Sequence, residues 1–514
     1  MTTDATSSTP EPGRPQAAAI HPQEDYPDPR NELQRQDDES IGAEQSGALT
    51  DTGPDPHRLV DEIVAGILAE RRETLRFHLD SPPLQFDVLP RPGPPGQPGQ
   101  PDLGDTILVA SGELLLRVPA DAEAGPGPGT AGRPGAAADE APPPFDVADG
   151  LLRELGYRPV TPPFHAVLPL RKYVIADRGA DQLLRDRDQI RARSGAELDL
   201  NYVVTAGHLV KADDYPRKTA AHRCYSPEWI RRHPVTRKIT VAVIDTGINH
   251  ESRADGWLDG IPEGGTNIDP LDVFPVRDVN GQIVRGDGLL DLSAGHGTFV
   301  AGVVEQVAPA ATIVVYRAVD TDGMGTSDDV GYAIIQAAND GADIINLSLG
   351  TMTVDNLPPV AFTAALDIVA AAHPDVLIVA SAGNTGLETP MFPAAMKGVV
   401  GVGALAADLT PAPWSNHGFW VNCSAVGVGV ISTFVDGIEP HTDTSTGEVV
   451  TEQFGPDAWA IWSGTSFSAP QIAGAVAQLC QLNDVGPAVA LGQLLAGRPT
   501  LPGFGFVVPI LPGT

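Results

Sequence analysis

An octet near the carboxyl end of the chain places a serine among small residues: Ser463-Gly464-Thr465-Ser466-Phe467-Ser468-Ala469-Pro470. The segment 471–482 that follows is predicted to be a helix, so Ser466 should lie just before a helix N-terminus. Unpaired backbone N–H groups and the positive end of the helix dipole gather there. Such groups can stabilise an oxyanion, which an acyl-transfer nucleophile needs beside it. Ser466 is therefore a candidate nucleophile, provided that the chain supplies a base.

Two other motifs supply the base and a group to orient it. The run Val241-Ala242-Val243-Ile244-Asp245-Thr246-Gly247 predicts a buried strand with Asp245 at its carboxyl end, and His296 stands between two glycines where a helix should begin. A serine hydroxyl needs a neutral imidazole to take its proton, and that imidazole needs a carboxylate on its other nitrogen. Read singly, these residues are a turn residue, a helix-start residue and a helix cap. If all three residues had only these ordinary roles, an aspartate, a histidine and a serine would stand in these motifs, in this order along the chain, by several coincidences.

A fourth motif offers a hydrogen-bond donor for the reaction's transition state. Val379-Ala380-Ser381-Ala382-Gly383-Asn384 predicts a strand end that leads to an asparagine. The Asn384 side-chain amide could donate to the tetrahedral oxyanion beside the backbone N–H of Ser466.

The elements that must position these residues follow from the hydrophobic pattern. Short apolar runs alternate with helix-length segments, which predicts βαβ units and a parallel sheet covered on both faces. In such sheets the functional residues lie beyond the carboxyl ends of the strands. The predicted strands are 239–244, 313–316, 344–347, 376–379 and 399–402.

These motifs resemble the four signature blocks of the subtilisin-like serine peptidases (subtilases) over about residues 235–485. The blocks are Asp-Thr-Gly, His-Gly-Thr, the asparagine block and Gly-Thr-Ser-x-Ser-Ala-Pro. The resemblance implies a three-layer, doubly wound, mostly parallel α/β fold and an endopeptidase that forms an acyl-enzyme without a catalytic cofactor. It implies Asp245 as orienter, His296 as general base and then acid, Ser466 as nucleophile and Asn384 as oxyanion donor.

The resemblance extends to a substrate groove that binds protein or peptide substrates between two strand edges, by strand addition. The residues that it implies are Ser348, Leu349 and Gly350 on one edge, Gly323 and Gly325 on the facing edge, and Ala382 and Gly383 in the wall of the pocket for the residue before the cut.

The region before the peptidase segment predicts a small α+β unit. Helices are expected at 147–155 and 181–193, and strands at 106–109, 113–118, 166–168, 172–175 and 198–204. The order β-α-β-β-α-β is typical of a ferredoxin-like unit. Residues 112–118 and 199–203 resemble the subtilase propeptide, which implies a zymogen that is inhibited by its own N-terminal domain.

The predicted domain organisation has five parts. They are a disordered acidic tail (1–56), a helix with a Pro/Gly linker (57–103), the propeptide-like inhibitory and chaperone domain (104–206), a junction where such enzymes cut themselves (207–224) and the peptidase domain (225–514). The sequence does not select one cut site in the junction.

Composition limits the partners. A formal net charge of −33 argues against nucleic acid and anionic membranes, and no uncharged apolar run reaches membrane-spanning length. Three widely spaced cysteines give no disulfide or zinc pattern. We expect a monomer, and a cytoplasmic location because no signal peptide is visible. Export without a signal peptide is the alternative.

Calcium is left open, with no ligands assigned. Asp278-Val279-Asn280-Gly281 resembles the opening of a calcium loop but lacks the rest of the pattern, so a turn is favoured. Subtilases often carry structural calcium, and one place to look is the same insertion, which holds Asp269, Asp272, Asp287 and Asp291.

One alternative function is weighed against the endopeptidase. The chain could be a regulatory, peptide-binding module on a peptidase fold, whose N-terminal domain stays docked with little turnover. An inactive enzyme on this fold usually loses a triad member, and none is lost here.

Overall fold

The computed structural model describes most of residues 225–514 and much of the region before them. The described residues are 86–90, 106–119, 142–160, 167–206, 215–220, 235, 237–249, 253–261, 267–273, 275–277, 283–442 and 449–510. The predicted tail, the helix and linker of 57–103 apart from 86–90, and most of the junction 207–224 lie outside them. The five-part domain division therefore stays a prediction.

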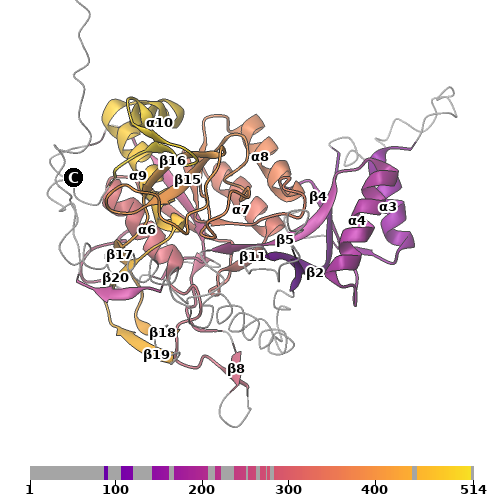
Figure 1. Cartoon of the computed structure of the whole chain (residues 1–514), viewed down its shortest axis with the longest axis horizontal. Coiled ribbons are helices and arrows are strands. Elements are labelled where there is room, and N and C mark those ends of the chain that lie inside the picture. The colour runs from indigo at the N-terminus through magenta and orange to yellow at the C-terminus, as the bar shows by residue number, and fades with distance from the viewer. Residues whose placement is uncertain are drawn as a thin grey trace, which may run out of the picture.

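A mostly parallel sheet forms the centre of the larger unit (Figure 1). Its strand order is β10-β7-β12-β14-β15-β16-β22-β21, and only β21 runs antiparallel to its neighbour. The strands are β10 (Thr312–Arg317), β7 (Thr240–Asp245), β12 (Ile344–Leu347), β14 (Leu377–Ser381), β15 (Val399–Leu405), β16 (Val421–Val426), β22 (Gly505–Val507) and β21 (Thr500–Leu501). All five predicted strands of this sheet are present, and the subtilisin-like α/β fold is confirmed.

Helices cover both faces of this sheet. Alternate residues of β7 enter two separate apolar clusters: Val241 and Val243 pack with α6 and α9, while Ala242 and Ile244 pack with α7 and α8. Burial on both faces explains why the strands are continuous apolar runs. The helices are α6 (His296–Val307), α7 (Ser327–Asn339), α8 (Val360–Ala372), α9 (Thr465–Asn483) and α10 (Pro487–Leu495). Within the described residues, none of the helices is long and apolar enough to cross a bilayer.

Short sheets surround this centre. A strand from the junction, β6 (Arg217–Thr219), pairs with β20 (Trp459–Trp462), which also pairs with β17 (Val430–Thr433). Two hairpins complete the periphery: β8 (Pro275–Arg277) with β9 (Ile283–Arg285), and β18 (Gly437–Thr442) with β19 (Val449–Phe454). The chain runs from β20 directly into the segment that carries Ser466.

The N-terminal unit has the predicted order of elements and the sheet order β5-β2-β4-β3. Its sheet is antiparallel throughout, and β1 adds to it beside β2. The elements are β1 (Phe86–Pro90), β2 (Thr106–Arg117), α3 (Pro144–Glu154), β3 (Arg158–Val160), β4 (Leu170–Val174), α4 (Ala180–Ser194) and β5 (Leu198–Ala206).

Three predictions of secondary structure were wrong. The strands expected at 106–109 and 113–118 are one strand, β2, whose pairing with β5 is irregular between Val109 and Leu114. In the segment 166–168, residue 166 lies outside the described residues, and the rest is a turn in which the N–H of Leu170 bonds to the carbonyl of Leu168 at 2.7 Å. On the side away from β2, β4 pairs with β3, an exposed edge strand without the apolar alternation that signals a strand. Helix α9 begins at residue 465 instead of 471.

Candidate active site

The carboxyl end of β7 and the start of α6 bring Asp245 and His296 together. Both side chains are buried, and His296 Nδ1 lies 2.7 Å from Asp245 Oδ1. A Cβ at Gly297 would lie 2.1 Å from the carbonyl oxygen of Gly247, so this close approach of helix to strand requires glycine. With Nδ1 donating to the carboxylate, Nε2 is the nitrogen left to accept a proton. That atom is buried and has no hydrogen-bond partner.

A second carboxylate, Asp269, supports this pair. The Thr246 hydroxyl donates to Asp269 at 3.0 Å and accepts the Gly297 N–H at 3.0 Å. The Gly295 N–H also donates to Asp269, at 2.9 Å. Burial raises the pKa of the Asp269 carboxyl, while the N–H groups of Gly295 and Leu271 oppose that rise. These contacts tie the end of β7 to the first turn of α6, a role that the sequence did not reveal.

Two aromatic rings enclose the His296 imidazole. The Trp462 ring packs edge-on against it, with centroids 5.5 Å apart and an interplanar angle of 88°, and the Phe467 ring is 5.3 Å away. Both rings are buried. They limit the access of water to the imidazole, which strengthens electrostatic interactions around it. Phe467 lies inside the octet and could have been suspected from the sequence.

Ser466 occupies the second position of α9 instead of preceding the helix. Its hydroxyl donates to the carbonyl oxygen of Ser348 at 3.3 Å, whereas His296 Nε2 has no partner. Catalytic hydrogen bonds are often rotated or long before a transition state is bound. The helix can include Pro470 because the carbonyl of Ser466, which Pro470 cannot bond, accepts from the Ser348 hydroxyl at 2.7 Å instead.

Asn384 follows β14 and faces the first turn of α9. Its Oδ1 accepts from the backbone N–H of Thr465 at 2.9 Å and from the Thr465 hydroxyl at 2.7 Å. Because these two donors fix the oxygen, the amide nitrogen is directed elsewhere and is available to donate. Thr465 is thus a positioning residue for Asn384 that the sequence analysis missed, although it stands within the Gly-Thr-Ser block.

Strand β5 of the N-terminal unit lies between the two predicted edges of the substrate groove. One edge is β11 (Met324–Thr326) and the other is β13 (Leu349–Gly350), and both pair with β5 in the antiparallel sense. The N–H of Ala206 also donates to the carbonyl of Gly323 at 2.8 Å. The paired residues are Met324 with Thr205, Gly325 with Val204, Thr326 with Val203, Leu349 with Ala206 and Gly350 with Thr205.

The remaining predicted groove residues lie nearby. Ser348 directly precedes β13. Ala382 donates its N–H to Val402 at 2.8 Å, and the N–H of Gly383 donates to the Thr465 hydroxyl at 3.0 Å. Their place in the wall of a substrate pocket stays a prediction.

The acidic insertion uses its carboxylates as loop acceptors. Asp272 accepts from the N–H groups of Asp287 and Gly288, and Asp291 accepts from that of Val273. Among the residues that the structure describes, no group of three or more His, Cys, Asp or Glu could hold a metal ion. The segment 278–281 lies outside those residues. Cys423 is buried and unpaired.

Known proteins match the segment that contains these residues. The profile of the subtilase family (Peptidase S8) matches residues 236–496. Thermophilic serine proteinase of Bacillus sp. (strain AK1) is 34% identical over 46% of this chain and 51% of its own length. Halolysin of Haloferax mediterranei is 28% identical over 49% of this chain and 43% of its own length. Thermitase of Thermoactinomyces vulgaris is 30% identical over 46% of this chain and 72% of its own length. The chain thus spans about half the length of the first two relatives.

Proposed function

Because the chain belongs to the subtilase family, we propose that it is a serine endopeptidase that cuts protein or peptide substrates through an acyl-enzyme. One observation carries the proposal: the 2.7 Å contact between His296 Nδ1 and Asp245 Oδ1, which leaves a buried, unpartnered Nε2. Rotation of the Ser466 hydroxyl away from the Ser348 carbonyl frees its proton for that nitrogen. Subtilases need no cofactor for this chemistry.

The steps follow from these positions. The Ser466 hydroxyl attacks the substrate carbonyl as His296 Nε2 takes its proton, and Asp245 stabilises the resulting imidazolium. The Asn384 amide nitrogen and the Ser466 N–H donate to the developing oxyanion. His296 then gives its proton to the leaving amine, and a water molecule hydrolyses the acyl-enzyme by the same steps in reverse.

The docked strand supports a self-inhibited zymogen. Strand β5 fills the groove by backbone pairing on both sides, which is how an extended substrate would bind. While it is there, another peptide cannot pair with β11 and β13. The N-terminal domain is therefore an intramolecular inhibitor in this proposal, and its removal activates a monomeric enzyme. The match to the subtilase family and to a serine proteinase favours an endopeptidase over a regulatory module with little turnover.

A fluorophosphonate probe tests the proposal directly. Such probes react covalently with activated serines, so the self-processed chain should be labelled and a Ser466→Ala chain should not. Labelling of both chains, or of neither after the groove has been emptied, would count against an activated Ser466. A Ser468→Ala chain is a matched control, because the Ser468 hydroxyl donates to the Ala425 carbonyl at 3.1 Å and takes no part in the steps above.

A further inference from the structure

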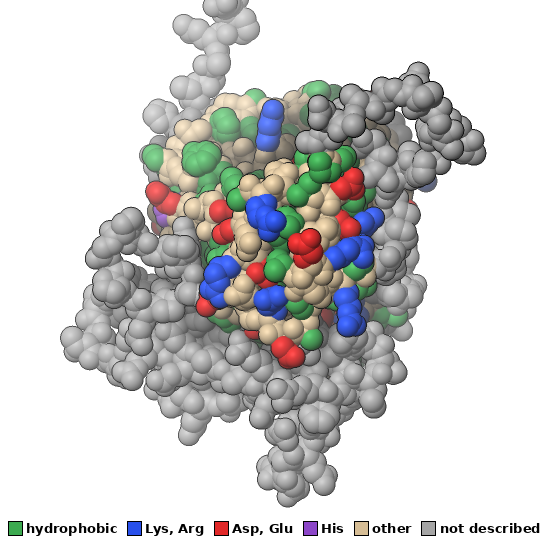
Figure 2. Space-filling model, turned by 90° about the vertical axis from the view of Figure 1, so that its right-hand side faces the viewer, with side chains coloured by type: hydrophobic (Ala, Val, Ile, Leu, Met, Phe, Trp, Pro, Cys, Tyr) green, Lys and Arg blue, Asp and Glu red, His purple; other side chains and the backbone are tan. Residues whose placement is uncertain are grey.

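The ion pairs between the N-terminal unit and the peptidase domain share one polarity. In the part of the chain that the structure describes, the cation always comes from the N-terminal unit and the carboxylate from the peptidase domain. By contrast, the outer face of the N-terminal unit carries both basic and acidic side chains (Figure 2). The pairs are Lys172 with Asp328 (2.8 Å), Arg117 with Asp367 (2.6 Å), Arg191 with Asp355 (3.1 Å) and Arg187 with Asp355 (3.5 Å).

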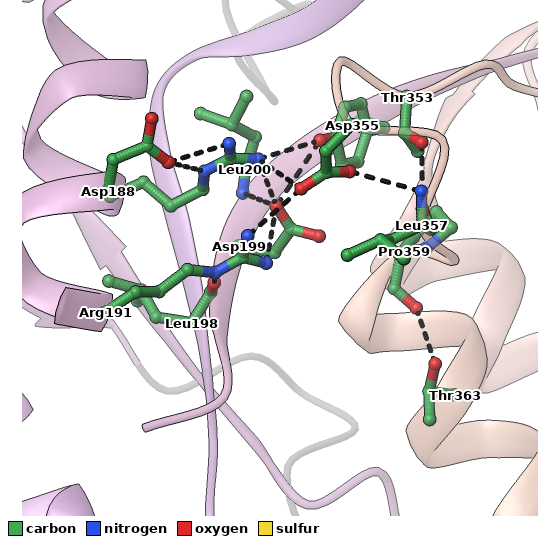
Figure 3. Close-up of polar contacts among 12 residues, drawn as sticks. Asp188, Arg191, Leu198, Asp199, Leu200, Thr353, Asp355, Leu357, Pro359 and Thr363 are labelled. Carbon is green, nitrogen blue, oxygen red and sulfur yellow. Dashed lines mark hydrogen bonds and ion pairs between the residues drawn. The ribbon is translucent and has the colours of Figure 1, made fainter. Parts of the chain in front are cut away.

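Asp355 is the centre of one of these contacts. Arg191 reaches from α4 toward both Asp355 and the buried Asp199 of β5, as Figure 3 shows. Burial raises the pKa of Asp199, while Arg191 and Arg187 lower it. The two arginines therefore compensate three carboxylates: Asp188 and Asp199 of the N-terminal unit and Asp355 of the peptidase domain. When the N-terminal unit leaves, it takes both arginines away and Asp355 loses its counter-charge.

Asp328 is the second residue of α7 and follows β11, the proposed edge of the substrate groove, by two residues. The register that pairs Thr326 with Val203 places Asp328 opposite Asn201 when it is continued along β5. The Asn201 amide donates to Asp328 Oδ1 at 2.8 Å, and Lys172 lies 2.8 Å from the other oxygen. The Asp328 side chain is fully buried in this arrangement. In a substrate bound in the same register, one residue pairs with Gly325. The residue three positions before it would place its side chain beside this carboxylate.

We propose that the surface uncovered by release of the N-terminal unit is a docking site for basic polypeptide. This acidic surface consists of Asp328, Asp355 and Asp367, and it selects substrates with Lys or Arg on the N-terminal side of the scissile bond. The inference rests on the proposed endopeptidase function. A basic polypeptide is expected because of charge complementarity. In the structure, the N-terminal unit contacts these carboxylates through lysine, arginine and amide groups.

The test compares three peptides as substrates of the enzyme that forms when the full-length chain cuts itself and releases its N-terminal unit. Two long peptides differ only at the position that corresponds to Asn201, which carries Lys in one and Glu in the other, and a short peptide keeps the scissile bond but begins after that position. We expect kcat/KM for the Lys peptide to exceed that for the Glu peptide by roughly three- to tenfold at low salt. The ratio should shrink as salt screens the charges, and Asp328→Asn should abolish it. Asp375→Asn, which removes an exposed carboxylate after α8, should preserve the ratio.

Two outcomes would overturn the inference. Equal kcat/KM for the Lys and Glu peptides, with the short peptide still cut, would reject the acidic surface and leave the endopeptidase intact. Failure to cut any peptide or to label Ser466 would reject the function itself. A second measurement needs no turnover. In the Ser466→Ala chain, Asp355→Asn should raise hydrogen exchange at the β5 amides several-fold relative to Asp375→Asn, because it removes a charge that holds the strand. Unchanged exchange would show that these charges do not hold a bound strand.

Discussion

Ser348 and Ser466 exchange two hydrogen bonds. The Ser348 hydroxyl donates to the carbonyl oxygen of Ser466 at 2.7 Å, and the Ser466 hydroxyl donates to the carbonyl oxygen of Ser348 at 3.3 Å. The first bond replaces the helical bond that Pro470 cannot make. The residue that precedes β13, the proposed substrate-binding edge, is thereby coupled to the helix turn that carries the proposed nucleophile.

Replacing Ser348 with alanine should leave the Ser466 carbonyl without its donor. A buried acceptor that loses its partner costs about 1–3 kcal/mol, so we expect a lower melting temperature and roughly tenfold lower kcat. The measurement is thermal unfolding together with hydrolysis of a short peptide. Ser424→Ala is the matched control, since its buried hydroxyl donates at 2.7 Å to the Phe504 carbonyl, away from the site. Equal losses of activity in both variants would show that the Ser348 contact has only a structural role.

Replacing Asn384 with alanine should lower kcat by about 100- to 1,000-fold with little change in KM, because the donor acts on the transition state. That magnitude is the one measured for an oxyanion-hole donor in subtilisin, a member of the same family, and it is carried over to this chain. Thr465→Ser keeps the hydroxyl that holds Asn384 and should stay close to wild type. A rise in KM with unchanged kcat in Asn384→Ala would assign Asn384 to substrate binding instead.

The buried carboxyl of Glu305 should make the free energy of unfolding depend on pH. Burial raises the pKa of this α6 carboxyl to about 7, and the charges of Asp259 and Asp255 add to the rise. The folded chain therefore holds this proton more tightly than the unfolded chain. Its contribution to stability is complete below about pH 4 and is lost as pH rises through about 7, up to about 3 kcal/mol.

The measurement is thermal unfolding of the Ser466→Ala chain from about pH 5 to about pH 8. Stability should decline between these pH values as Glu305 loses its proton. Glu305→Gln should remove this decline, whereas Glu388→Gln, at an exposed carboxylate, should keep it. The same decline in all three chains would contradict the assignment to Glu305.

The docked strand gives a further prediction. The Val204 side chain is fully buried in the groove contact, while that of Thr205 is half-buried. Burying an unpaired carboxylate costs several kcal/mol, so Val204→Asp in the Ser466→Ala chain should open β5. We expect its amides to exchange at least about tenfold faster than those of Thr205→Asp. Equal exchange in the two variants would show that the Val204 side chain does not hold the strand.

The sequence predicted what local patterns determine. Apolar runs located the strands of the parallel sheet, and the four motifs located the residues of the candidate site. Contacts between distant segments were not predictable, because no local pattern encodes them. The start of α9 depends on a hydroxyl 118 residues away, and Arg191 meets Asp355 across 164 residues. The exposed β3 was missed because it is a strand only through its pairing with β4.

The most direct test of the account is the mass of the purified full-length chain after incubation, with wild type and Ser466→Ala compared. A chain that continues the β5 register one residue beyond Ala206 would lie opposite Ser348, beside the nucleophile. We therefore predict that wild type splits at the bond after Gly207, and that the Ser466→Ala chain keeps its full mass. Cleavage of both chains at that bond would contradict the claim that Ser466 is the nucleophile of an endopeptidase. The claim would also be contradicted if the wild-type chain stayed whole and hydrolysed no peptide after its groove was emptied.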